Sequence, residues 1–138
     1  MDMKSSYLPL YTLETNVETS AGDVYTYEVV HPLIVRDFVI AVVGEALAVD
    51  TAAPVIAVDV DPAASARVEK GRVTLADGDA IGKARSFASV DPTDMTPFPL
   101  VPGDKIIVEQ ITAGTDGTAV AGRYIVYALV QWKPDGVV

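Results

Sequence analysis

The sequence contains no cysteine, a single histidine and a single tryptophan. Without cysteine there can be no disulfide, no thiol catalysis and no thiolate metal site, although cysteine-free chains occur in every redox compartment. Because His31 is the only histidine, metal sites built on two or more histidines are excluded, and a serine-histidine nucleophile pair would depend on this one residue. His31 stands between Val30 and Pro32, where we interpret it as a turn or strand-end residue.

Positive charge and long apolar runs are also scarce. Ten Lys and Arg against nineteen Asp and Glu give a formal charge of −9, which repels polyanions, so we expect no nucleic-acid partner. The purest apolar stretch, residues 38–44, is far shorter than the about 20 residues that cross a bilayer as a helix. Residues 1–7 lack the basic segment and apolar stretch of a secretory signal. We therefore predict neither membrane association nor export by that route.

What the sequence does have is eight short apolar runs separated by Gly, Pro and Asp. Apolar and polar residues alternate within most runs, as half-buried strands require. The runs cover residues 7–13, 22–30, 33–43, 54–60, 67–75, 83–90, 105–112 and 123–133. The 138 residues suit one domain, and about eight strands suit a jelly roll better than an immunoglobulin-like fold. We predict an all-β, single-domain, eight-stranded β-sandwich of the jelly-roll type.

Several segments carry finer predictions. The run 33–43 is expected to bend where Arg36 and Asp37 interrupt its two faces, with Ile34 and Phe38 in phase. The charges in 67–75 place that strand near a sheet edge. Four prolines in 91–102 predict an ordered loop outside any central ladder. Residues 43–53 are read as a turn or one short helix.

The two ends of the chain supply a candidate interface. Residues 1–21 are assigned to an N-terminal segment or arm with a possible first strand, and 22–138 to the sandwich. The apolar segment 7–13 is either a first strand in its own sheet with Pro9 on the edge, or an arm added to a neighbouring subunit. The last run is apolar on both faces and needs cover from two layers or from a neighbour. The predicted subunit or capsid interface comprises Tyr7, Leu8, Leu10, Tyr11, Leu13, Tyr127, Leu129 and Trp132.

Acidic residues occur in pairs in the predicted loops, at Asp59 and Asp61, at Asp77 and Asp79, and at Asp91 and Asp94. Such pairs can collect oxygen ligands for Ca²⁺, but none has the spacing of a helix-loop-helix calcium site. Asx turns explain them more simply, and calcium binding stays open. We predict no catalytic, cofactor-binding or metal-binding residues, no cofactor, and no enzyme activity.

The order of turn motifs resembles small structural proteins of tailed-phage virions. The motifs are 60–62 (Val-Asp-Pro), 71–75 (Gly-Arg-Val-Thr-Leu), 77–78 (Asp-Gly), 82–83 (Gly-Lys), 102–106 (Pro-Gly-Asp-Lys-Ile) and 120–122 (Val-Ala-Gly). In that group, a jelly-roll or related β-sandwich commonly serves as a capsid decoration (cement) protein or as a head-fibre base. The resemblance covers about residues 23–133 and rests on turn chemistry.

The resemblance implies a non-enzymatic virion protein on the capsid exterior, a homotrimer that binds the major capsid protein and stabilises capsomer contacts. A charge of −9 suits that exterior position, away from packaged DNA. The alternative is a carbohydrate-binding or receptor-binding module of a phage fibre or tail. Its possible stacking residues are Tyr7, Tyr11, Tyr25, Tyr27, Tyr124, Tyr127 and Trp132. A glycosidase that uses two of the loop acids is a third and more distant hypothesis.

Overall fold

The computed structural model describes residues 5–16, 22–48, 54–76, 78–89, 97–112 and 122–132. These residues form ten β-strands and no helix, so none of them offers a helix that could cross a membrane. The strands are β1 (Ser5–Asn16), β2 (Gly22–Glu28), β3 (Leu33–Val42), β4 (Val55–Asp61), β5 (Val68–Thr74), β6 (Ala84–Ser86), β7 (Ala88–Ser89), β8 (Phe98–Leu100), β9 (Lys105–Thr112) and β10 (Arg123–Trp132). The all-β prediction is confirmed.

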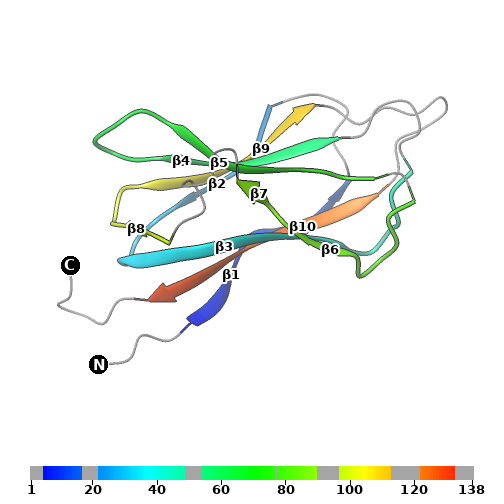
Figure 1. Cartoon of the computed structure of the whole chain (residues 1–138), viewed down its shortest axis with the longest axis horizontal. Coiled ribbons are helices and arrows are strands. Elements are labelled where there is room, and N and C mark those ends of the chain that lie inside the picture. Colours follow the sequence, from blue (N-terminus) through cyan, green and yellow to red (C-terminus); the bar gives the residue numbers. More distant parts are fainter. Residues whose placement is uncertain are drawn as a thin grey trace.

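The strands lie in two antiparallel sheets packed face to face, a β-sandwich (Figure 1). The first sheet has the order β1-β10-β3-β6, and β8 also pairs with β3. The second has the order β2-β9-β4-β5-β7. All eight predicted runs contain strands, and the run 83–90 is divided between the sheets as β6 and β7. Phe87, buried between them, donates its N–H to the carbonyl of Phe38 at 3.0 Å.

The hydrophobic core fills the space between the two sheets. Strand β10 illustrates how the sequence builds it, because every second residue from Tyr124 to Val130 is fully buried while those between them are half-buried. The inward side chains of β3, β4 and β9 meet the same core. The largest fully buried hydrophobic side chains are Tyr124, Phe38, Leu33, Ile40, Ile56, Leu75 and Ile106. Each such side chain contributes about 1.5–3 kcal/mol by leaving water.

Strand β3 has the predicted irregularity near Arg36. Its pairing with β10 jumps from Val35 opposite Val130 to Asp37 opposite Leu129, so Arg36 is the additional residue of a bulge. The bulge changes the phase of the alternation, and both Val35 and Phe38 are therefore buried. The predicted common phase of Ile34 and Phe38 is wrong for this reason, since Ile34 is only half-buried.

Two loop predictions have different outcomes. Phe98–Leu100 was expected within a loop but forms β8, which pairs with the end of β3. Pro99 lies at the middle of this three-residue strand, where only one neighbouring strand has to be satisfied. Within 43–53, the described residues 43–48 contain no helix, and the other five lie outside the described residues.

The charged strand β5 was predicted near a sheet edge. It lies one strand from the edge, beside the two-residue β7.

The N-terminal segment adopts the first of its two alternatives. Strand β1 pairs with β10 of the same chain and forms an edge of the first sheet.

Strand β10 begins directly after Gly122, which has a φ of 131°. A Cβ atom at this glycine would collide with Leu47, so glycine is required where β10 enters the sheet.

Candidate functional site

The outer face of the first sheet is apolar. We define the apolar outer face as Val39 and Ala41 of β3, Ala84 of β6, and Ile125, Tyr127 and Leu129 of β10. The register brings these residues together, because Tyr127 lies opposite Val39, and Ala41 lies opposite both Ile125 and Ala84. Their side chains are half-buried, apart from the exposed Ala84. Val39, Ala41, Ala84 and Tyr127 line a shallow hollow of about 270 Å³.

Among the side chains that the structure describes, the charged ones nearest to this face lie at its margins. Arg36 donates a hydrogen bond to Gln131 at 2.7 Å, and Asp37 accepts one from the Ser86 hydroxyl at 3.3 Å. At the other end, Arg123 lies 3.9 Å from Glu45. The described part of the chain provides no further layer over the apolar outer face. Half-exposed aliphatic and aromatic side chains that are grouped in this way are typical of a protein-binding surface.

The predicted interface residues fall into three groups. Tyr127 and Leu129 belong to the apolar outer face, as an interface requires. Trp132 packs instead against the core, and its ring lies 6.0 Å from that of His31. The third group lies in the edge strand β1 and comprises Tyr7, Leu8, Leu10, Tyr11 and Leu13. In the register, Tyr7 is opposite Leu129 and Leu8 is opposite Ala128. The side chains of this group lie outside the described residues.

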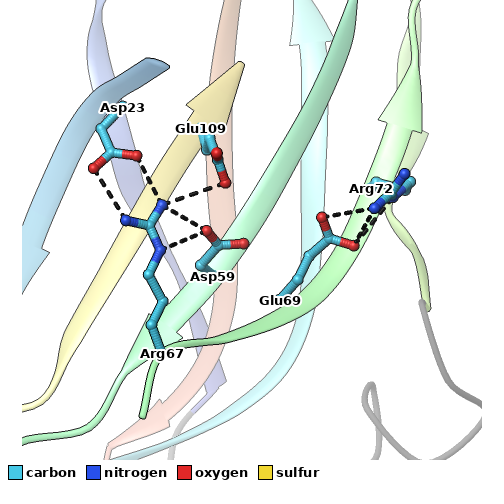
Figure 2. Close-up of polar contacts among 6 residues, drawn as sticks. All are labelled: Asp23, Asp59, Arg67, Glu69, Arg72 and Glu109. Atoms are coloured by element: carbon cyan, nitrogen blue, oxygen red, sulfur yellow. Dashed lines mark hydrogen bonds and ion pairs between the residues drawn. The ribbon is translucent and has the colours of Figure 1, made fainter. Parts of the chain in front are cut away.

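The outer face of the second sheet is crossed by charged side chains (Figure 2). We define the charged outer face as Asp23 of β2, Glu109 of β9, Asp59 of β4, Arg67 of the β4–β5 loop, and Glu69 and Arg72 of β5. Glu69 accepts hydrogen bonds from Arg72 at 2.8 to 3.0 Å. Beneath this layer, Ala57 and Ile107 are only 0% and 5% exposed. The second sheet therefore has little exposed apolar surface on its outer side.

Arg67 is the centre of this face. Its guanidinium donates to both carboxylate oxygens of Asp23 at 2.7 and 3.1 Å, and to Glu109 at 3.3 Å. Its Nε donates to Oδ2 of Asp59 at 2.7 Å. The hydrogen bonds to Asp23 and Asp59 hold the pKa of Arg67 above its ordinary value, and the same Arg67 bond holds the pKa of Asp23 below its own.

Asp59 is the most deeply buried acid of the group, with a side chain only 4% exposed. It lies within β4, inside the predicted run 54–60, and not in a loop as its pairing with Asp61 suggested. Its Oδ2 binds Arg67, whereas its Oδ1 is buried with no hydrogen-bond partner. The adjacent Glu109 has a raised pKa, first because its protonated carboxyl group can hydrogen-bond to Asp59 and second because of burial. Sequence reasoning missed this group, although an aspartate between Val58 and Val60 was a signal that a partner is needed.

The other buried acids hold turns together. Asp79 binds Arg85 at 2.6 Å and accepts the N–H of Ala76, which closes the turn before β6. Asp104 accepts the N–H groups of Val101 and Ala63 and so joins two loops at one end of the sandwich. Asp79 thus has a role in a turn, but its bond runs back to Ala76 and is not the predicted Asx turn, while Asp77, Asp91 and Asp94 lie outside the described residues. Within the described ranges, no group of three or more His, Asp or Glu residues is placed to hold a metal ion.

The arrangement thus defines a β-sandwich with one apolar and one charged outer face. Comparisons with protein-family models, with curated proteins and with solved structures gave no significant match.

Proposed function

We propose that this chain is a non-enzymatic structural protein of a phage virion, a capsid decoration (cement) protein that binds the outer face of the head. The observation that carries the proposal is the apolar outer face, whose half-exposed side chains have no covering layer among the described residues. Contact with the major capsid protein would remove this apolar surface from water, which is the dominant favourable contribution to most protein association.

The strand order supports the jelly-roll form of the sandwich. The first four strands alternate between the sheets, β1 and β3 in the first and β2 and β4 in the second. The last two long strands then insert between them, β9 between β2 and β4, and β10 between β1 and β3. Long connections that return a late strand beside an early one are typical of Greek keys, and two Greek keys make a jelly roll. Jelly rolls occur in viral capsid and lectin domains.

The charge distribution supports binding through one face only. The chain carries a formal charge of −9, and the charged outer face displays four acids against two arginines. The apolar outer face itself bears no charged side chain. Copies that approach through their charged faces repel one another, so the uncharged face is the one available for contact.

We further propose that copies associate as trimers at the outside of the capsid and bridge neighbouring capsomers. The margin formed by β10 and the edge strand β1 supports a contact between subunits, because an edge strand retains unpaired backbone groups. Linked subunits on a symmetric shell gain avidity, so each individual contact can be modest.

A shell-binding experiment tests the proposal. Head shells assembled without this chain are mixed with the purified protein and sedimented, with Leu129→Asp as the test variant and Val30→Asp as the matched control. Leu129 lies on the apolar outer face, whereas Val30 is 74% exposed in the β2–β3 loop. We expect the wild type and the control to co-sediment with shells and Leu129→Asp to bind at least about tenfold more weakly, since a buried unpaired charge is costly. The proposal would be contradicted if the shells did not bind the wild type, or if they bound all three proteins equally.

The carbohydrate-binding alternative has less support from the described aromatic residues. Tyr124 is fully buried, and Tyr27 and Trp132 pack against the core. Tyr25 is 37% exposed, but it lies on the second sheet, and Tyr127 lies on the first. A stacking platform needs neighbouring exposed rings. Glycan-array binding that disappears on Tyr25→Ala would favour the sugar-binding alternative over the capsid proposal.

A further inference from the structure

We propose that Asp59 and Glu109 form a proton-binding site on the charged outer face, in which one proton held between the two carboxyl groups joins strands β4 and β9 of the second sheet. The inference requires no assumption about the function proposed above. It begins from one buried atom, Oδ1 of Asp59, which has no hydrogen-bond partner.

The unpartnered oxygen belongs to a side chain that is 4% exposed, on a central strand of the second sheet. A buried carboxylate oxygen without a donor loses its hydration and gains nothing in return, which is among the costliest arrangements in a protein interior. Its sister oxygen, Oδ2, already binds Arg67. A donor for Oδ1 is therefore the missing component of this site.

The surrounding cations direct their hydrogen bonds to other oxygen atoms. Arg67 directs its Nη1 and Nη2 groups to Asp23, and its Nη2 also to Glu109. On β5, Arg72 makes three hydrogen bonds to Glu69, the residue opposite Asp59 in the register. Two residues further along the same face, Lys105 of β9 lies opposite both Asp61 of β4 and Glu28 of β2.

The remaining neighbour is Glu109 on β9. It lies opposite Ala57, one step diagonally from Asp59 and on the same face of the sheet. A protonated Glu109 is a donor, and its O–H can complete the hydrogen bonding of Asp59 while Arg67 keeps its own contacts. When Glu109 is ionised, the two carboxylates repel each other and Oδ1 of Asp59 is left without a donor.

Charge counting supports the same conclusion. Asp23, Asp59 and Glu109 surround the single guanidinium of Arg67, so the group carries a net charge of −2 when all three acids are ionised. Carboxylates that share a site lose their protons in coupled steps, and one proton is retained to higher pH. The pKa of Glu109 is raised first by a hydrogen bond with Asp59, second by burial and third by the charge of Asp59, while Arg67 opposes the shift. A metal ion is a poorer occupant than a proton, because Arg67 already fills the centre (Figure 2).

The proton links pH to stability with a definite sign. The pKa of Glu109 in the folded protein lies above its ordinary value of 4.5, so the folded state binds the proton more tightly than the unfolded state. Protonation therefore stabilises the fold, and this contribution grows as pH falls from neutral towards 4.5. The contribution is lost as pH rises through the folded-state pKa of Glu109.

The test compares Glu109→Gln with the wild type and with a control, Glu45→Gln. Glutamine at 109 carries a permanent N–H donor for Asp59 and cannot titrate. Glu45 is 49% exposed, lies beside Arg123 at the start of β10, and is outside the group. Melting temperature is measured from pH 7 to pH 5. We expect Glu109→Gln to raise the melting temperature at pH 7 by roughly 2–4 °C and to reduce the rise seen on acidification. Glu45→Gln should keep the wild-type pH dependence.

A second variant and a direct titration complete the experiment. Glu109→Ala removes the titrating group without adding a donor, so it should lose the pH dependence but gain less at pH 7 than Glu109→Gln. Carboxyl-carbon NMR of the wild type should show a glutamate that titrates above the ordinary range and is absent from both variants. A Glu109 that titrates at its ordinary pKa would overturn the proposal, as would a Glu109→Gln melting curve that still follows the wild-type pH dependence. Stabilisation of the wild type by calcium at pH 7 that disappears in Glu109→Gln would assign the site to a cation instead.

Discussion

The two outer faces of this sandwich share the same strand geometry but carry opposite kinds of side chain, charged on one and apolar on the other. On the second sheet, Ala57 and Ile107 are buried and charged side chains lie across the face, with Arg67 reaching over from the loop. On the first sheet, the equivalent positions of β3 and β10 are Val39, Ala41 and Tyr127, which stay half-buried without a charged layer. The charged outer face is thus largely covered by the chain itself, whereas the described residues leave the apolar outer face half-exposed.

The largest effect is expected on the charged outer face, from the substitution Arg67→Ala. The change leaves Asp23, Asp59 and Glu109 together without a cation, and Asp59 cannot reach solvent. We expect a loss of about 2–4 kcal/mol in the free energy of unfolding, below the upper range for fully buried pairs because Arg67 is 34% exposed. Urea denaturation at pH 7 measures it. Arg72→Ala is the control, since Arg72 is 51% exposed and its loss should cost less than about 1 kcal/mol. Equal losses in the two variants would contradict the central role of Arg67.

A charge added to the apolar outer face should have a smaller effect on folding. Val39→Lys places an ammonium group in the hollow beside Tyr127, and its long side chain can reach water because the site is open. We expect the free energy of unfolding to change by less than about 1 kcal/mol, while binding of a hydrophobic dye falls. Thr26→Lys, on the exposed β2 of the other sheet, should leave dye binding unchanged. Dye binding that is insensitive to Val39→Lys would show that this face is not the exposed apolar surface.

The smallest expected effect concerns Asp23 and appears only above a certain pH. Its pKa is lowered by the hydrogen bond from Arg67, so its contribution to stability is present above its ordinary value of 3.8 and is lost as pH falls through the folded-state pKa. Because Asp23 is 48% exposed, Asp23→Asn should lower the melting temperature by only about 1–2 °C at pH 7. Below pH 3.8, the two proteins should converge. A difference that grows in acid would reverse the predicted sign.

The strands could be predicted from sequence because local alternation determines them. Strand β10 is an example, since its inward and outward residues can be separated by period two alone. Strand β8 could not, because prolines flank and occupy it and its pairing depends on the position of β3. Proline statistics describe the isolated segment, whereas a short edge pairing is determined by the tertiary structure.

The two outer faces also differed in how far they could be predicted from the sequence alone. Tyr127 and Leu129 were identified from the apolar pattern of one strand. The Arg67 group was missed because Arg67 lies 44 positions from Asp23 and 42 positions from Glu109, and only the pairing of β2, β9 and β4 brings them together. Within one strand, Asp59 looks like the beginning of a turn. Its role becomes visible only when the neighbouring strands are placed.

The edge strand β1 has a consequence for open-ended stacking of copies of this chain. Its pairing with β10 is irregular at two points, between Pro9 and Tyr11 and between Tyr11 and Thr15, and Pro9 offers no N–H group. A long regular margin would act as a template for open-ended stacking of identical sheets, as in amyloid fibrils. Interruptions at these places disfavour such growth.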